Sequence, residues 1–371
     1  MSLDNIVYVG TYTRALSHTP GQAEGIYRCR FDPVTGALTV ESAIPGAANP
    51  SYLALDPQRR YLYAVEEIEE YEGQASGAVS AFAVDAETGG LTWLNRQPSH
   101  GTAPCHVSIE SSGRWALLAN YGSGSIAAYP IAADGQLGEA SAIVQHEGGS
   151  VNPQRQQGPH AHMIVPAPRP AGAGAQRRIL VNDLGLDKVL VYRLDPDQGT
   201  LTPNDPPWGT VDPGLGPRHL AFHSGRDIVY VLNEIGSSLT TFAYDPASGA
   251  LATLQTLSTL PGDFTGNNSC ADIHVAPSGR FVYSSNRGHD SIAIFAVDEA
   301  SGTLSPVGHV PSGGGTPRNF ALDPTGSFLL AANQRGNTIV SFRINQETGW
   351  ITPTGHVAEV PTPVCVIFAG M

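Results

Sequence analysis

Alternating apolar and polar residues recur along the whole chain in short runs bounded by Gly and Asp. Examples are SIAIFAVD (Ser291–Asp298), SLTTFAYD (Ser238–Asp245) and AVSAFAVD (Ala78–Asp85). A period of two with turn residues at both ends is typical of a β-strand that places one face in a core. The pattern therefore predicts an all-β protein built from many short antiparallel strands.

The alternating runs lead into one turn signature, in which Asp or Asn shortly precedes a Gly and then Leu or Ile. Its seven copies are DPVTGAL (Asp32–Leu38), DAETGGL (Asp85–Leu91), ADGQL (Ala133–Leu137), DPDQGTL (Asp195–Leu201), DPASGAL (Asp245–Leu251), DEASGTL (Asp298–Leu304) and NQETGWI (Asn345–Ile351). They recur about every 52 residues, a period typical of propeller blades. We interpret the signature as the hairpin turn between the third and fourth strands of each blade.

Two further apolar segments precede the alternating run in the later copies, for example HLAFHS (His219–Ser224) and IVYVLN (Ile228–Asn233). The first copy lacks its first strand, and the C-terminal tail TPVCVIFAG (Thr362–Gly370) matches it. An open array of blades would leave that apolar tail as an unpaired edge. Residues 1–371 are therefore expected to form a single seven-bladed β-propeller with four antiparallel strands per blade. Its ring would be closed by pairing the C-terminal strand into the first blade.

Composition narrows the range of functions. The chain contains 33 acidic and 20 basic residues, for a net charge of −13, and Lys188 is the one lysine. An acidic surface argues against nucleic acid or an anionic membrane as a partner. Lys188 does not lie in a P-loop motif, and it is the one candidate for Schiff-base chemistry.

The cysteines and the N-terminus bear on metals and location. Cys29, Cys105, Cys270 and Cys365 are far apart and form no CxxC pair, and the chain contains no HExxH. We therefore predict no disulfide scaffold and no metal site. The N-terminus lacks a signal-peptide pattern, and no apolar stretch approaches 18 residues. These features predict a cytoplasmic protein without a membrane partner, and no feature predicts an oligomeric state.

Differences between the seven copies indicate candidate functional positions. The penultimate position of the second strand holds Thr11, Glu66, Asn120, Asp183, Asn233, Asn286 and Asn333. This near-uniform position is interpreted as a structural turn-maker. The next position holds Tyr12, Glu67, Tyr121, Leu184, Glu234, Arg287 and Gln334. Such diversity has no structural explanation and favours function.

A second variable position opens the first strand of each blade. It holds Ser51, Cys105, His162, Arg218, Ala271, Arg318 and Val364, and the following position adds His106, His219 and Asp272. Both variable positions are expected on the same face of the ring, around the central channel. Arginines there predict an anionic ligand, since a guanidinium binds carboxylate or phosphate oxygens bidentately. Alternatively, Arg218 and Glu234 form only a structural ion pair.

The stretches GPHAHMIVPAP (Gly158–Pro168), GPRHLAFHSGRDIVYVLNE (Gly216–Glu234) and ADIHVAPSGRFVYSSNR (Ala271–Arg287) resemble the seven-bladed lactonase family. That family includes propeller-type 6-phosphogluconolactonases and the carboxy-cis,cis-muconate lactonizing enzyme. The resemblance covers essentially the whole chain and implies that four residues are catalytic: His162, Arg218, Glu234 and Arg287. We further predict that His106, His219, His274 and Arg318 bind substrate. The chain departs from the family pattern between Pro168 and Arg177, where a longer outer loop is expected.

The sequence thus favours metal-independent and cofactor-free hydrolysis of a small anionic sugar lactone, with 6-phosphogluconolactone as the preferred substrate. Glu234 or His162 would be the general base, and Arg218 and Arg287 would hold the anionic group and the developing oxyanion. Cyclisation of a muconate carboxylate at the same site is an alternative. A non-catalytic interaction propeller is a second alternative. A calcium-dependent gluconolactonase-type site using Glu67, Asn120 and Asn233 is a third.

Overall fold

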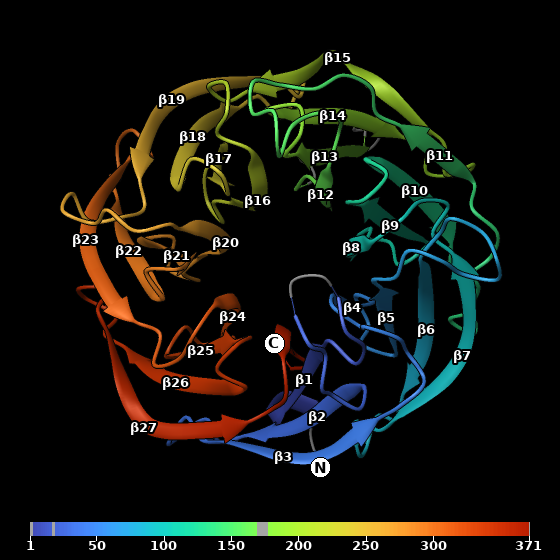
Figure 1. Ribbon diagram of the computed structural model, residues 1–371, viewed down its shortest axis with the longest axis horizontal. Coiled ribbons are helices and arrows are strands. Elements are labelled where there is room, and N and C mark those ends of the chain that lie inside the picture. The colour runs from blue at the N-terminus through green and yellow to red at the C-terminus, as the bar shows by residue number, and fades with distance from the viewer. Residues whose placement is uncertain (1–2, 17–18, 169–176, 371) are drawn as a thin grey trace.

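The computed structural model describes residues 3–16, 19–168 and 177–370. These residues form seven four-stranded antiparallel sheets arranged as a closed ring (Figure 1). The one helical element in these ranges is a short 3-10 turn, η1 (Leu3–Asn5). The prediction of a single seven-bladed propeller with four strands per blade is confirmed.

Each blade runs from an inner strand at the channel to an outer strand at the rim (Figure 1). Blade 1 contains β28 (Pro363–Phe368), β1 (Ile6–Thr11), β2 (Ile26–Phe31) and β3 (Leu38–Ile44). Blade 2 contains β4 (Leu53–Leu55), β5 (Tyr61–Glu66), β6 (Ala78–Val84) and β7 (Leu91–Pro98). Blade 3 contains β8 (Pro104–Ile109), β9 (Trp115–Asn120), β10 (Ser125–Pro130) and β11 (Ala142–Gln145). Blade 4 contains β12 (Ala161–Pro166), β13 (Arg177–Asp183), β14 (Lys188–Leu194) and β15 (Leu201–Thr210). Blade 5 contains β16 (Pro217–Phe222), β17 (Ile228–Asn233), β18 (Ser238–Tyr244) and β19 (Leu251–Ser258). Blade 6 contains β20 (Ser269–Val275), β21 (Phe281–Arg287), β22 (Ser291–Val297) and β23 (Leu304–Pro311). Blade 7 contains β24 (Pro317–Leu322), β25 (Phe328–Asn333), β26 (Thr338–Ile344) and β27 (Ile351–Glu359).

The hydrophobic core lies in layers between neighbouring blades. One layer packs Phe281 and Ile294 of blade 6 against Leu329 and Phe342 of blade 7. Both faces of a middle strand are therefore buried, and β17 and β25 are buried at every position. This explains why the second strand of each blade reads as a continuous apolar run rather than an alternating one.

The repeated turn signature connects each blade to its neighbour. The Tyr283 hydroxyl of blade 6 donates to the carbonyl oxygen of Gly349 in the blade-7 turn at 2.8 Å. Gly349 has a φ of +71°, and a side chain there would collide with the Phe281 ring. The glycine is thus required both by the left-handed backbone and by the packed ring. Tyr230 makes the equivalent bond to Gly302 at 2.8 Å.

Beta-bulges occur near the start of the inner strands. The pairing register shifts between Pro104 and His106, between Ala161 and Met163, between Pro217 and His219, and between Pro317 and Asn319. The residue skipped by each shift is Cys105, His162, Arg218 or Arg318. A bulge leaves its extra residue out of the ladder and re-aims its side chain. In these four blades, the variable position of the inner strand is therefore the bulged residue, which does not pair with the second strand.

The C-terminal strand closes the ring. Strand β28 pairs antiparallel with β1, with Val9 opposite Val366 and Val7 opposite Phe368. Val364, Cys365 and Val366 are at most 4% exposed. The prediction of closure through the C-terminal tail is confirmed.

Two further predictions from the sequence concern the loop after Pro168 and membrane-spanning segments. The predicted longer loop between Pro168 and Arg177 falls at residues 169–176, which lie outside the described residues. Within the described part of the chain, no helix is long and apolar enough to cross a membrane.

Deleting Thr362–Met371 is expected to lower the melting temperature by at least about 5 °C, because the deletion removes a buried strand and exposes two sheet edges. Thermal denaturation followed by circular dichroism measures this. Deleting only Gly370–Met371 leaves β28 intact and is the matched control. A ten-residue truncation that melts within a degree or two of the full chain would refute the closure argument.

Candidate active site

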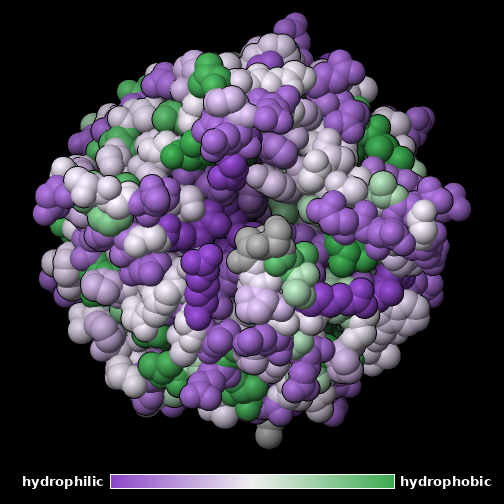
Figure 2. All heavy atoms as spheres, in the orientation of Figure 1, coloured by the Kyte–Doolittle hydropathy of each residue, from purple (hydrophilic) through white to green (hydrophobic). Residues whose placement is uncertain are grey.

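A central cavity opens on the face where inner strands begin and second strands end. Its volume is about 1090 Å³, and its lining includes His162, Glu234, Arg287 and Arg318. Figure 2 shows a hollow at the centre of this face that is bordered largely by hydrophilic residues. Both variable positions identified from the sequence therefore meet at one site.

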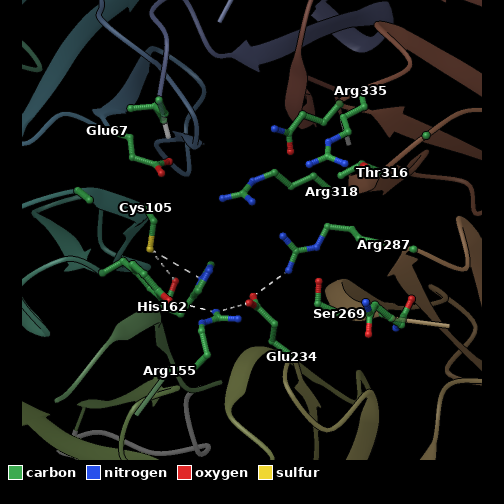
Figure 3. A pocket seen from close by; sticks show the side chains of 18 of the residues that line it. Glu67, Cys105, Arg155, His162, Glu234, Ser269, Arg287, Thr316, Arg318 and Arg335 are labelled. Atoms are coloured by element: carbon green, nitrogen blue, oxygen red, sulfur yellow. Dashed lines mark hydrogen bonds and ion pairs between the residues drawn. The ribbon is translucent and has the colours of Figure 1, made fainter. Parts of the chain in front are cut away.

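Glu234 gathers three guanidinium groups around its carboxylate. Its Oε2 accepts from Arg218 Nε at 2.9 Å and lies 2.8 Å from Arg287 Nη2. Its Oε1 accepts from Arg155 Nη2 at 2.6 Å (Figure 3). Burial alone would raise the pKa of Glu234, but Arg287, Arg218 and Arg155 outweigh burial and hold it well below its usual range. The carboxylate is therefore ionised and a weak proton acceptor.

Arg287 and Arg155 bridge the carboxylate and the open cavity. Arg287 comes from the end of β21 and also donates to the carbonyl oxygen of Cys270 at 2.8 Å. Burial lowers the pKa of Arg287 to about 10, against the opposing effect of Glu234. The group therefore remains cationic at neutral pH. Arg155 is more open, with 40% of its side chain exposed.

Arg155 was missed from the sequence because it lies on the longest of the connections between blades, from β11 to β12, where extra residues have no equivalent in the shorter connections. This connection runs from His146 to His160, and Asp183 holds both of its ends. Asp183 Oδ2 lies 2.6 Å from His146 Nδ1, and its Oδ1 accepts from the His160 backbone N–H at 2.8 Å. Asn152 Oδ1 caps the Arg155 N–H at 3.1 Å. The motif NPQR was the available signal, since Asn-Pro marks a turn that can present the arginine.

His162 lies beside this cluster at the bulge of β12. Its ring contacts Tyr121 edge-on with centroids 5.4 Å apart, and its Nδ1 lies 3.8 Å from Cys105 Sγ. Burial and the charge of Arg218 lower the pKa of His162 well below its ordinary value. The imidazole is therefore neutral and able to accept a proton. Burial raises the pKa of Cys105, so this thiol is not an activated nucleophile.

Arg218 lies beneath the cavity rather than in its lining. It is 3% exposed, and it donates to Glu234, to the Ala271 carbonyl oxygen and to His219. The pairing of Arg218 with Glu234, considered from the sequence as a structural alternative, is present. These protein acceptors take the Nε and Nη1 donors of Arg218, and contact of Arg218 with a substrate remains a prediction.

A second acidic centre, Asp272, supports this lower layer. His219 Nδ1 lies 2.8 Å from Asp272 Oδ1, and His274 Nε2 lies 3.1 Å from Asp272 Oδ2. Asn319 also donates to Oδ2 at 2.6 Å. Burial lowers the pKa of His219 to about 4, so its neutral Nε2 accepts from Arg218 at 3.2 Å. Asp272 thus orients His219, which in turn orients Arg218.

Three of the predicted substrate-binding residues lie outside the cavity lining. His106 is 2% exposed and packs against Tyr52, with ring centroids 4.2 Å apart. His219 is held by Asp272, and His274 lies further along β20, with its ring against Phe320. The structure thus places these three histidines outside the cavity lining, and their contact with a substrate remains a prediction. Of the four, only Arg318 lines the cavity.

The opposite side of the cavity carries Arg318 and Glu67. The guanidinium of Arg318 lies over the Tyr12 ring, 5.6 Å from its centroid, and the Tyr12 hydroxyl donates to Glu67 at 3.0 Å. Figure 3 shows Arg318 and Glu67 both directed into the cavity.

The repeated asparagines at the end of the second strands are structural, as expected: Asn120, Asn233 and Asn286 each donate to the serine at the start of the next strand of their own hairpin. Asn120 Nδ2 donates to the Ser99 carbonyl oxygen at 2.9 Å, and Asn286 Nδ2 donates to that of Thr259 at 2.8 Å. Each side chain therefore secures the connection that enters its blade. Asn233 and Asn120 are fully buried and do not line the cavity. The oxygen set of the calcium alternative is consequently not assembled with Glu67.

No group of three or more His, Cys, Asp or Glu side chains within residues 3–16, 19–168 and 177–370 is arranged to hold a metal ion. The four cysteines are buried free thiols. Metal independence remains a prediction.

Comparison with known proteins places the chain in a family. The family model described as "Lactonase, 7-bladed beta-propeller" matches residues 6–368. The 6-phosphogluconolactonase of Bacillus subtilis (strain 168) is 38% identical over 363 residues, covering 98% of each chain.

Two solved structures are similar over nearly the whole chain. A putative 6-phosphogluconolactonase from Bacteroides fragilis aligns with a TM-score of 0.87 at 36% identity, covering 98% of this chain and 97% of that one. The Pseudomonas aeruginosa periplasmic gluconolactonase aligns with a TM-score of 0.89 at 33% identity, covering 98% of each. Since that neighbour is described as periplasmic, a cytoplasmic location for this chain stays a prediction. The family match and these alignments agree with the resemblance found in the sequence: the chain belongs to the seven-bladed β-propeller lactonase family.

Proposed function

We propose that this protein hydrolyses 6-phosphogluconolactone in the central cavity. The observation that carries the proposal is a neutral buried histidine, His162, beside guanidinium groups fixed by one buried carboxylate. Lactone hydrolysis needs a base for water and positive charge for the oxyanion, and this arrangement supplies both. The names of the Bacillus subtilis and Bacteroides fragilis relatives support the phosphorylated substrate.

In this mechanism His162 acts as the general base. It removes a proton from a water molecule as the water oxygen attacks the lactone carbonyl carbon. The imidazolium then returns the proton to the ring oxygen as the carbon–oxygen ester bond breaks, which yields the open-chain acid. A neutral imidazole can perform both steps, whereas the carboxylate of Glu234 is a weak acceptor because three guanidiniums bind it.

Arg287 and Arg155 would stabilise the oxyanion. Both line the cavity, and each uses part of its donor set on Glu234, so their remaining N–H groups are available to a ligand. Glu234 is then a positioning residue: it holds the guanidiniums in place before the substrate arrives. Preorganised donors of this kind avoid the cost of reorganisation during the reaction.

The alternatives from the sequence gain no comparable support. The named relatives are lactone hydrolases, so they favour hydrolysis over muconate cyclisation. A non-catalytic interaction propeller does not explain a cavity lined by a neutral histidine and fixed guanidiniums.

Replacing His162 with Asn is expected to lower kcat on 6-phosphogluconolactone by roughly 100- to 10,000-fold, because the variant loses the proton acceptor. Steady-state assays corrected for spontaneous lactone hydrolysis measure this. In the wild-type enzyme the acid limb of kcat/KM should fall below pH 6.5, because a lowered pKa keeps the base neutral to lower pH. An acid limb at or above pH 6.5, or full activity in H162N, would contradict the assignment.

Replacing Glu234 with Gln is expected to lower kcat/KM by about 100-fold or more and also to raise KM, because an amide cannot hold three guanidiniums. Loss of a general base alone would lower kcat and leave KM nearly constant. Glu87→Gln, an exposed acid in the turn between β6 and β7, is the charge-matched control. If E234Q lowers kcat and leaves KM unchanged, Glu234 would instead be the general base.

Activity is expected to persist without a divalent metal. Dialysis against a chelator should change kcat/KM by less than about twofold, because no suitable ligand group occurs in the described residues. Loss of activity in the chelator, followed by recovery with Ca²⁺ or Zn²⁺, would favour the metal-dependent alternative.

A further inference from the structure

One wall of the cavity is built by blade 7 and differs chemically from the Glu234 cluster. This blade-7 wall consists of Gly315, Thr316, Arg318, Gln334 and Arg335. Figure 3 shows Thr316, Arg318 and Arg335 together, across the cavity from Arg155 and His162. No step of the proposed hydrolysis uses these residues.

Two cavity guanidiniums, those of Arg318 and Arg335, form no ion pair with a carboxylate in the described part of the chain; Arg335 is exposed, and Arg318 is half-buried. Arg155 and Arg287 both bind Glu234, at 2.6 and 2.8 Å. Within the described ranges of the chain, Arg318 forms no hydrogen bond and no ion pair, and its guanidinium rests on the Tyr12 ring at 5.6 Å. Burial alone would lower the pKa of Arg318, but Tyr12 and Glu67 raise it, so the group stays charged. Its donors therefore face the cavity without a protein acceptor.

Neutral donors flank this guanidinium. Gln334 is 2% exposed and lines the cavity, yet its side-chain amide has no hydrogen-bond partner among the residues that the structure describes. A buried amide of this kind normally has partners, so a ligand that accepts its N–H would complete the site. The Thr316 hydroxyl likewise has no protein partner in those ranges and stands at the same wall.

Two carboxylates in the cavity lining, Glu67 and Asp290, accept hydrogen bonds from the protein. Asp290 Oδ1 accepts from the Thr316 N–H at 2.9 Å and from the Gly288 N–H at 3.1 Å. Glu67 accepts from the Tyr12 hydroxyl at 3.0 Å. Glu67 acts on Arg318 through its charge, but among the described residues neither acid forms an ion pair with this guanidinium.

We propose that the blade-7 wall is the phosphate subsite for a phosphorylated sugar lactone, with Arg318 as its main ligand and Gln334 and Thr316 as neutral donors. A guanidinium fork matches phosphate oxygens bidentately, and such charge-assisted bonds are stronger than neutral ones. The inference rests on the proposed hydrolysis and deepens it. The Glu234 cluster would act on the carbonyl, while the blade-7 wall would select the phosphate.

The test compares two substrates in Arg318→Gln. We measure kcat/KM for 6-phosphogluconolactone and for the unphosphorylated glucono-δ-lactone. The ratio of the two values should fall by roughly 10- to 100-fold, mainly through KM of the phosphorylated substrate, because a bidentate charged contact is lost. Inorganic phosphate should also become a weaker competitive inhibitor of R318Q.

Arg226→Gln is the matched control, since it removes the same charge from an exposed turn on the opposite face. Its ratio should equal that of the wild type. If R318Q melts early, Arg318→Lys keeps the charge but not the fork and should give an intermediate ratio.

An unchanged ratio in R318Q, or a wild-type enzyme with no preference for the phosphorylated lactone, would overturn the subsite. Failure of the proposed hydrolysis can be distinguished from failure of the phosphate subsite. If the wild type hydrolyses neither lactone, calorimetric titration with inorganic phosphate still decides. Binding to the wild type that weakens in R318Q supports the subsite, and equal binding to both refutes it.

Discussion

The pairing of β28 with β1 is the interaction on which the rest of the molecule depends. It joins the two ends of the chain and fixes seven inner strands around one axis. Because every inner strand starts on the same face, residues far apart in sequence converge there: His162 from blade 4, Glu234 from blade 5 and Arg318 from blade 7. The bulge at the start of an inner strand then frees the side chain at that position from the regular ladder.

Two buried carboxylates organise the charges inside this ring. A buried carboxylate is costly unless it is paired and hydrogen-bonded. Glu234 meets that requirement with three guanidiniums, and Asp272 meets it with His219, His274 and Asn319. The layers are linked because His219 accepts from Arg218. The stability of each acid therefore depends on the groups that it positions.

The fold could be predicted almost completely from the sequence, because seven internal copies repeat the same strand and turn chemistry. The site could be predicted only in part. His162, Glu234, Arg287 and Arg318 were found because each is a charged or titratable exception at a position shared by all blades. Comparison of copies cannot find Arg155, because the connection that carries it is longer than those of the other blades.

His106, His219 and His274 were also predicted from the repeat to bind substrate, but the structure places them outside the cavity lining. A position in a repeat gives the strand and the face of the ring, but not the depth at which a side chain lies. Asp272 holds both His219, at 2.8 Å, and His274, at 3.1 Å. Spacing along the chain does not predict these tertiary contacts. The same holds for Arg218, whose Nε and Nη1 donate to protein acceptors below the cavity.

The net charge of −13 is compatible with an anionic substrate because electrostatic effects act over different distances. At physiological ionic strength the Debye length is about 8 Å, so acids on the outer surface are largely screened from a ligand in the channel. Inside the cavity the screening is weaker, and Arg155, Arg287 and Arg318 lie close to any ligand. Burial, together with the charges of Arg218 and Arg318, lowers the pKa of His162 and disfavours a proton on it. Charges around the cavity thus attract an anion and help to keep His162 neutral.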